Sequence, residues 1–230
     1  YKTTDYGKTW VNISKGIPNG AYTRVVREDV VRKGLLFAGT ETGMYISWDG
    51  GSGWQPFQLN LPIVPVTDMM IKHGDLVVAT MGRSFWIFDD LGLLRQFNGK
   101  EEALKVYQPE DAVIGNWGSP LNGTSADFKG AGSYQGVNPA NGVVIYYNLP
   151  KLADSVQVQM EIRDASGNLV RQLSTKGDPS FNRYDGGPPS EPLISKNKGL
   201  NRFVWDMRYP TLTGAPTAYM EGSYRGHKAS

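Results

Sequence analysis

The sequence predicts an all-β protein, and three observations lead to this fold class. Apolar residues recur with a period of two in short segments such as Val156–Ile162, which is typical of strands with one buried face. The chain holds 28 Gly and 14 Pro, the residues that favour turns between strands. A pattern of Asp, Gly and Trp returns after about 44 positions, which indicates a protein built from repeated β units.

The first elements of the chain carry this repeat. Residues 3–10 and residues 47–54 both read hydroxyl, any, Asp, any, Gly, any, any, Trp. In such a turn the Asp carboxylate can accept hydrogen bonds from the turn's own backbone, and the Gly adopts a conformation that a side chain would hinder. The predicted turn residues are Thr3, Asp5, Gly7, Thr9 and Trp10 in the first copy, and Ser47, Asp49, Gly51 and Trp54 in the second, where Gly53 replaces the Thr.

A third, degraded copy is expected one repeat further along the chain. The spacing of nine residues from Thr40 to Asp49 recurs between Thr80 and Asp89. Asp89 is therefore the expected counterpart of Asp49. The Gly and Trp of the pattern are missing at this copy, so the turn is expected to be only partly similar.

These residues resemble the Asp-box, or BNR repeat, of sialidases, sortilin-type receptors and many secreted bacterial propellers. The resemblance implies that residues 1–97 are the last blades of a β-propeller, in which each Asp-box joins the two outer strands of a blade. The stretch Ala79–Leu91 looks like the closing blade of a bacterial sortilin-like, glycosyl-hydrolase-like family. It implies an extracytoplasmic location (secreted, cell-surface or periplasmic) and further blades of the same protein that pack against these.

A connector and a second domain are expected to follow. Residues 98–135 form the connector, in which Glu101–Val106 is the one segment with a helical pattern, of about two turns at most. Residues 136–230 are similar to the Ig-like β-sandwich of flagellar-hook capping proteins, through the strands Val143–Tyr147 and Arg202–Trp205. A propeller needs about 4–8 blades and such a sandwich about seven strands, so both domains are expected to be incomplete and both chain ends to be cut.

Composition argues against several kinds of site. The absence of Cys excludes a disulfide, a thiolate zinc site and a Cys nucleophile, and only two His argue against a multi-His metal site. A net charge of +2 argues against a general nucleic-acid surface. No apolar run approaches the ~20 residues of a membrane-spanning helix. The sequence therefore predicts no cofactor, no metal, no nucleic-acid partner and no membrane span.

Two side chains are candidates for contact with a ligand. Glu41 lies in a loop between strands and could face one end of a propeller, and Arg83 precedes a strand and could point into the central channel. The alternatives are a solvated loop Glu and an Arg bonded to loop carbonyls or to Asp89 or Asp90. Glycoside hydrolysis needs two carboxylates across a cleft, whereas adjacent Asp89 and Asp90 would point to opposite faces of a strand. No catalytic residue is assigned.

The aromatic residues divide into two groups. Trp10, Trp54, Trp86 and Trp205 are expected in the core. Aromatic residues of loops could stack on sugars or partner chains, or pack at domain junctions. The loop group contains Trp48, Trp117, Tyr134, Tyr184 and Tyr224.

Three functions remain open from the sequence. The first is a non-catalytic interaction module whose propeller binds a protein, peptide or glycan. The second is the C-terminal part of a glycoside hydrolase whose catalytic residues lie upstream. The third is a structural component of a larger surface or secretion assembly. The first is favoured by the repeat pattern and by the lack of an assembled catalytic set, and fold alone does not choose among functions.

Overall fold

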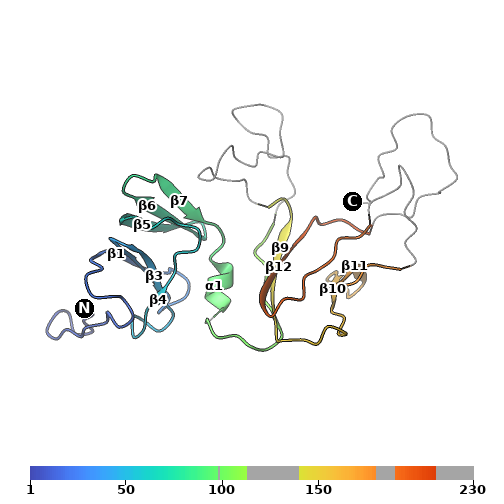
Figure 1. Ribbon diagram of the computed structural model, residues 1–230, viewed down its shortest axis with the longest axis horizontal. Helices are drawn as coiled ribbons and strands as arrows, with labels where there is room; N and C mark the ends of the chain where they lie inside the picture. The colour runs from blue at the N-terminus through green and yellow to red at the C-terminus, as the bar shows by residue number, and fades with distance from the viewer. Residues whose placement is uncertain (98, 113–139, 180–189, 211–230) are drawn as a thin grey trace, which may run out of the picture. The chain divides into compact units, whose positions relative to one another are not determined.

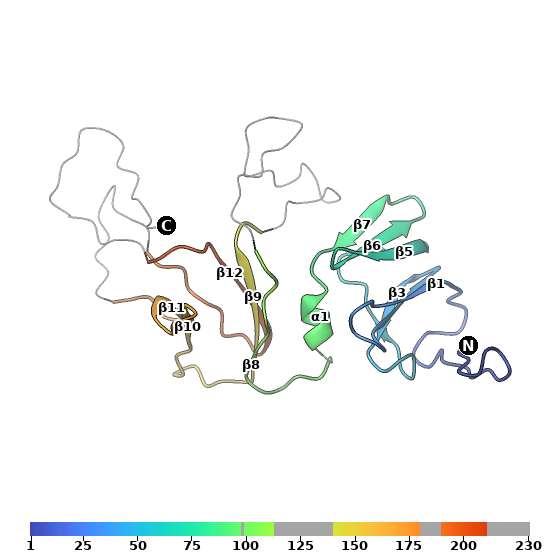
Figure 2. The ribbon, with the colours of Figure 1, turned by 180° about the vertical axis from the view of Figure 1, so that it is seen from behind.

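The computed structural model describes residues 1–97, 99–112, 140–179 and 190–210 of the 230-residue chain (Figures 1 and 2). These residues form mostly antiparallel strands and one short helix, so the predicted all-β class is confirmed. The chain divides into two compact units. The described part of the first unit ends at Lys100, and the second begins at Glu101.

The first unit holds two antiparallel sheets. The first sheet has the order β1-β2-β3-β4 and consists of β1 (Thr23–Glu28), β2 (Leu36–Thr40), β3 (Gly43–Ser47) and β4 (Gln55–Pro56). The second has the order β5-β6-β7 and consists of β5 (Val66–Lys72), β6 (Asp75–Thr80) and β7 (Phe85–Phe88). A tight turn joins β5 to β6, where His73 and Gly74 both have positive φ, as the preferred two-residue hairpin turn requires.

The two sheets repeat the same strand pairing. In the first sheet the pairing of β1 with β2 shifts between Thr23 and Val25. In the second sheet the pairing of β5 with β6 shifts at the corresponding place, between Val66 and Asp68. The two sheets therefore share an irregularity of pairing at the same position of their first two strands.

Between the two sheets, the third strands β3 and β7 are separated by one residue more than the second strands β2 and β6. Phe37 pairs with Ile46, and Val77, forty positions after Phe37, pairs with Ile87. The cause is the loop after β6, which is one residue longer: Thr80 N–H bonds to the carbonyl of Ser84, whereas Thr40 pairs directly with Gly43. The counterpart of Asp49 is therefore Asp90, and the alignment with Asp89 predicted from a fixed spacing is wrong by one residue.

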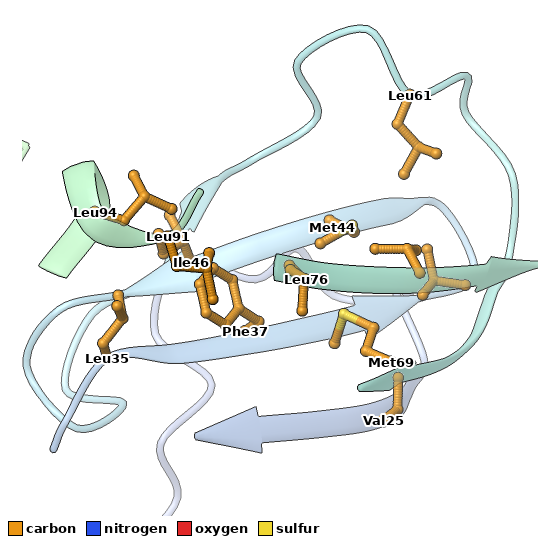
Figure 3. Close-up of a cluster of buried hydrophobic side chains, with 12 residues drawn as sticks. Val25, Leu35, Phe37, Met44, Ile46, Leu61, Met69, Leu76, Leu91 and Leu94 are labelled. Carbon is orange, nitrogen blue, oxygen red and sulfur yellow. The ribbon is translucent and has the colours of Figure 1, made fainter. Parts of the chain in front are cut away.

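A shared core lies between the two sheets (Figure 3). Phe37, Met44 and Ile46 of the first sheet are almost completely buried, as are Met69 and Leu76 of the second. The side chain of Val66 packs closely against the backbone of Gly39, because a Cβ on Gly39 would lie 2.5 Å from Val66 Cγ1. Arg27 also links the sheets, donating from Nε to the carbonyl of Met69 at 2.7 Å.

The helix is not where the sequence pattern predicted it. Helix α1 spans Gly92–Gln96, and Leu91 and Leu94 are buried in the core of the first unit. Glu101–Val106 is not helical: it ends in the strand β8 (Lys105–Val106), which pairs with a strand of the second unit. Charged residues at helix-like spacing were misleading there, because backbone pairing with a neighbouring strand overrides a weak helical preference.

The second unit holds two more sheets. One has the order β12-β9-β8, with β9 (Val143–Leu149) paired along its whole length to β12 (Gly199–Trp205). The other pairs β10 (Gln159–Arg163) with β11 (Leu169–Ser174). A core cluster joins residues from both sheets, including Tyr147, Leu149, Leu173 and Phe203. Within the described residues no helix is long and apolar enough to cross a membrane.

Candidate functional site

The turn at Asp5 is closed by hydrogen bonds among its own residues. Thr3 Oγ1 donates to Asp5 Oδ1 at 2.8 Å and accepts the backbone N–H of Gly7 at 2.8 Å. Asp5 Oδ1 accepts the N–H of Thr9 at 2.8 Å, and Asp5 Oδ2 accepts the Thr9 hydroxyl at 2.6 Å. Both oxygens of this carboxylate are therefore engaged inside the turn.

The turn at Asp49 repeats the arrangement. Ser47 Oγ donates to Asp49 Oδ1 at 2.7 Å and accepts the N–H of Gly51 at 3.0 Å. Asp49 Oδ1 accepts the N–H of Gly53 at 3.0 Å. The strands that flank the turns also correspond, because Lys2 bridges Val11 as Ile46 pairs with Gln55. One bond is missing, since Gly53 has no hydroxyl to match that of Thr9.

Each turn needs two consecutive residues with positive φ. They are Tyr6 and Gly7 in the first turn, at 57° and 87°, and Gly50 and Gly51 in the second, at 71° and 91°. The glycine has a further reason in the second turn, where a Cβ on Gly51 would lie 2.6 Å from Ile13 Cδ1. These local demands explain why the motif specifies Gly at its fifth position.

These hydrogen bonds favour the ionised form of both carboxyl groups. The hydroxyl and backbone N–H of Thr9, with the hydroxyl of Thr3, lower the pKa of Asp5 from 3.8 to about 2. The Ser47 hydroxyl and the Gly53 N–H likewise lower the pKa of Asp49. A carboxylate held in this way is a poor proton donor, and its chemistry is that of a structural acceptor.

The incomplete second turn gives a direct test of the motif. We expect Gly53→Thr to stabilise the first unit by about 1 kcal/mol, because the new hydroxyl can donate to Asp49 Oδ2 and the unfolded chain loses freedom. A Cβ at this position is tolerated, since it would lie 3.5 Å from Asp49 Oδ2 and φ is not positive. Urea unfolding followed by tryptophan fluorescence measures the change.

Gly53→Ala is the matched control, since it restricts the unfolded chain without supplying a hydroxyl. If Gly53→Thr were no more stable than Gly53→Ala, the bond that Thr9 makes in the first turn would have no energetic role.

The tryptophans that end the two turns lie in different surroundings. Trp54 is buried against Ala38 and Tyr45, and its indole N–H donates to the carbonyl of Ile13 at 2.6 Å. Trp10 is 59% exposed and donates to the carbonyl of Gly7. The expectation that Trp10 belongs to the core is therefore wrong for the described residues, although its indole N–H is satisfied within the turn.

Asp89 lies outside any turn of this kind. It accepts no hydrogen bond from the described residues, and partial loss of water together with the carboxylates of Asp75 and Asp90 raises its pKa. Asp90 has a φ of 62° and accepts the N–H of Gly92 at 2.8 Å, at the start of α1. At the third copy the chain therefore enters helix α1 and does not form a turn like those at Asp5 and Asp49. The Asp-box role predicted for Asp89 is wrong.

The two candidate ligand-facing residues are both engaged by neighbouring groups. Glu41 lies in the turn between β2 and β3, and its Oε1 accepts Arg24 Nε at 2.9 Å. Arg83 is exposed in the loop between β6 and β7, where Nη1 donates to the carbonyl of Gly82 at 3.1 Å. The structure does not bring Glu41 and Arg83 into one catalytic pair, and the loop-carbonyl alternative describes Arg83.

A buried ion pair in the first unit was not predicted from the sequence. Asp29 has a fully buried side chain and accepts Arg95 Nη2 at 3.0 Å. Its Oδ2 also accepts the N–H groups of Val31 and Arg32 at 3.0 and 2.6 Å. Burial alone would raise the pKa of Asp29, but the Arg95 and backbone donors outweigh it and lower the pKa below 3.8. The pair fixes α1 to the loop after β1.

A second buried cation lies in the second unit. The Arg171 side chain is only 2% exposed, and it donates from Nε to Glu191 Oε2 at 3.0 Å and from Nη1 to Asp206 Oδ1 at 2.6 Å. Nη1 also donates to the carbonyl of Arg208 at 3.1 Å. One guanidinium thus connects β11 to two segments that are distant in sequence.

Glutamine side chains near β10 and β11 bond to neighbouring side chains. A groove of about 570 Å³ runs along Gln157, Gln159 and Gln172. Gln157 Nε2 donates to Ser174 Oγ at 2.7 Å, and Gln172 Nε2 donates to Gln159 Oε1 at 3.2 Å. Among the described residues no group of three His, Asp or Glu side chains is arranged to hold a metal ion.

Of the five loop aromatics, the structure describes Trp48, which is partly buried. Trp48 packs at the edge of the first core, and its ring meets Phe97 edge-on with centroids 6.3 Å apart. The packing alternative therefore describes Trp48. The others lie outside the described residues: Trp117, Tyr134, Tyr184 and Tyr224.

Comparisons with protein-family models and with curated proteins found no match for this chain. The features that bear on function are therefore the repeated turns, the stacked sheets and the surfaces they leave exposed.

Proposed function

We propose that the chain is a non-catalytic interaction and scaffold module. In this proposal the first unit consists of the last blades of an extracytoplasmic Asp-box propeller, the second unit is an Ig-like sandwich, and the partner is a protein, peptide or glycan. The observation that carries the proposal is the repetition of one turn, with three matching hydrogen bonds, in two places 44 residues apart. The extracytoplasmic location rests on the resemblance of these turns alone.

The engagement of the acidic side chains supports a binding role over a hydrolytic one. Asp5 and Asp49 accept hydrogen bonds from their own turns, and Asp29 and Glu41 accept guanidinium groups. A glycosidase requires one protonated and one ionised carboxyl group facing a shared substrate. The hydrolase alternative draws only on Glu41 and Arg83. The third function, a structural component of a larger assembly, is compatible with the stacked sheets.

The proposal is tested with the full chain on a glycan array and on a panel of glycosidase substrates. We expect no hydrolysis above buffer, and Glu41→Gln and Arg83→Ala should behave as the unaltered chain does in the hydrolysis assay. Glu102→Gln, at an exposed position outside this site, is the matched control. Hydrolysis that falls about a hundredfold in Glu41→Gln but not in Glu102→Gln would contradict the proposal and favour the hydrolase.

A further inference from the structure

Four Asn–Gly pairs occur in the sequence, at residues 19–20, 98–99, 122–123 and 141–142. The structure describes both residues of the first and of the last pair. An Asn that precedes Gly is especially reactive, because the next residue has no side chain to hinder attack by its backbone nitrogen on the Asn amide. The two described pairs lie in contrasting surroundings, and the contrast separates a reactive pair from a protected one.

Asn19 and Gly20 lie in an exposed turn before β1. The turn is closed by a hydrogen bond of 3.1 Å from the N–H of Ala21 to the carbonyl of Pro18. Gly20 has a φ of 90°, and a Cβ built on it would have no atom within 4 Å. Within the described part of the chain, no hydrogen bond uses the N–H of Gly20 or the side chain of Asn19. The two groups that would react are therefore open to solvent and are not held by a neighbour.

The pair at residues 141–142 is held between two strands. Gly142 is buried, and a Cβ built on it would lie 2.2 Å from the carbonyl oxygen of Trp205. The next residue, Val143, is the first of β9 and pairs with Trp205 of β12. Attack on the Asn141 amide requires the peptide between Asn141 and Gly142 to rotate. At this position the rotation would disturb the pairing of β9 with β12, so the sheet protects the pair.

We propose that Asn19 is a site of spontaneous deamidation in the folded chain. The backbone nitrogen of Gly20 attacks Asn19 Cγ and forms a new C–N bond, while the bond from Cγ to the side-chain nitrogen breaks. The proton lost by the Gly20 nitrogen ends on the ammonia that leaves, and the product is a cyclic succinimide. Water then opens the ring at one of its two carbonyl groups, which gives aspartate or isoaspartate. The reaction consumes one water and releases one ammonia.

The modification changes the charge and the main chain at one end of the first sheet. Each event lowers the net charge of +2 by one, and isoaspartate adds a methylene group to the backbone. The carbonyl of Tyr22, two residues after Gly20, accepts the N–H of Glu41 at 3.0 Å. Glu41 in turn accepts Arg24 Nε. The new carboxylate therefore arises in the segment that borders this ion pair. The inference goes beyond the proposed function and does not depend on it.

Incubation of the full chain at mildly alkaline pH tests the inference, because the deprotonated backbone nitrogen is the nucleophile. Trypsin cleavage after Lys15 and Arg24 gives a peptide in which Asn19 is the only Asn. Deamidation adds about 1 Da to this peptide, since a carboxyl group replaces an amide. In the folded chain we expect Asn19 to react at least about tenfold faster than Asn141. In urea the two sites should react at similar rates, because the sheet no longer holds Asn141.

Two matched variants assign the signal. Asn19→Gln keeps an amide at the exposed position but would have to close a larger ring, so the mass gain in residues 16–24 should disappear. Asn141→Gln should leave the rate at Asn19 unchanged. Both positions are exposed, and the circular dichroism of both variants should match that of the unaltered chain.

Two results would overturn the inference. One is an Asn19 that stays intact in the folded chain while it reacts in urea, which would show that the turn protects it. The other is an equal rate at Asn19 and Asn141 in the folded chain. Neither result bears on the proposed interaction function, because glycan binding and hydrolysis are measured separately.

Discussion

Asp29→Ala is expected to destabilise the first unit by about 3 kcal/mol, because it leaves the buried Arg95 guanidinium without its carboxylate. The side chains of Asp29 and Arg95 are 0% and 17% exposed, so little water can replace the lost partner. The N–H groups of Val31 and Arg32 would lose their acceptor as well. Urea unfolding monitored by tryptophan fluorescence gives the change in unfolding free energy.

Asp68→Ala is the matched control, since Asp68 pairs with Arg27 but is 64% exposed. Exposed pairs contribute less than about 1 kcal/mol, so this variant should remain close to the unaltered chain. In a double-mutant cycle, adding Arg95→Met to Asp29→Ala should recover part of the loss, because the unpaired charge is removed. Equal effects of Asp29→Ala and Asp68→Ala would show that burial of the pair has no energetic consequence.

The Asp29 pair also sets a direction for pH dependence. Because the folded-state pKa of Asp29 is lower than its ordinary value of 3.8, its contribution to stability is complete above that value and is lost as the pH falls through the folded pKa. The difference in stability between the unaltered chain and Asp29→Ala should therefore shrink below pH 3.8. Asp5 and Asp49, with lowered pKa values, act in the same direction.

Arg171→Ala is expected to have an effect of similar size in the second unit, about 3 kcal/mol. The variant removes a large buried side chain and three sets of hydrogen bonds, to Glu191, Asp206 and the carbonyl of Arg208. Glu191 and Asp206 are about one-third exposed and can be rehydrated in part, so most of the loss should come from the cavity and the freed segments. Chemical unfolding measures the total loss of stability, and amide hydrogen exchange measures the loosening of the freed segments.

Faster exchange at the backbone N–H of Ile194, which bonds to the carbonyl of Ser174, is the specific signature expected. Arg171→Lys should recover little, because one ammonium group cannot reproduce the forked guanidinium contacts. Arg163→Ala removes an exposed ion pair with Glu161 and serves as the control. A loss no greater than that of Arg163→Ala would contradict a structural role for the buried guanidinium.

The sequence was informative where the interactions are local. All the hydrogen bonds of the turn at Asp5 join residues of a single eight-residue motif, so spacing alone indicated its chemistry. Spacing failed for Asp89, because one extra residue in the loop after β6 changes the phase of the following strand. Asp29 and Arg95 are 66 positions apart, and no local pattern indicates that two such residues meet. Helix α1 was missed for the same reason, since burial of Leu91 and Leu94 depends on distant strands.

The compactness of the Asp5 and Asp49 turns has a consequence for the order of folding. Each turn closes a loop of only a few residues, and contacts of such short sequence separation form on the microsecond scale or faster, well before distant strands meet. The pairing of β1 with β2 and the stacking of the two sheets require longer loop closures. The two turns would therefore act as early, independent nuclei that fix the direction of the outer strands before the core between the sheets condenses.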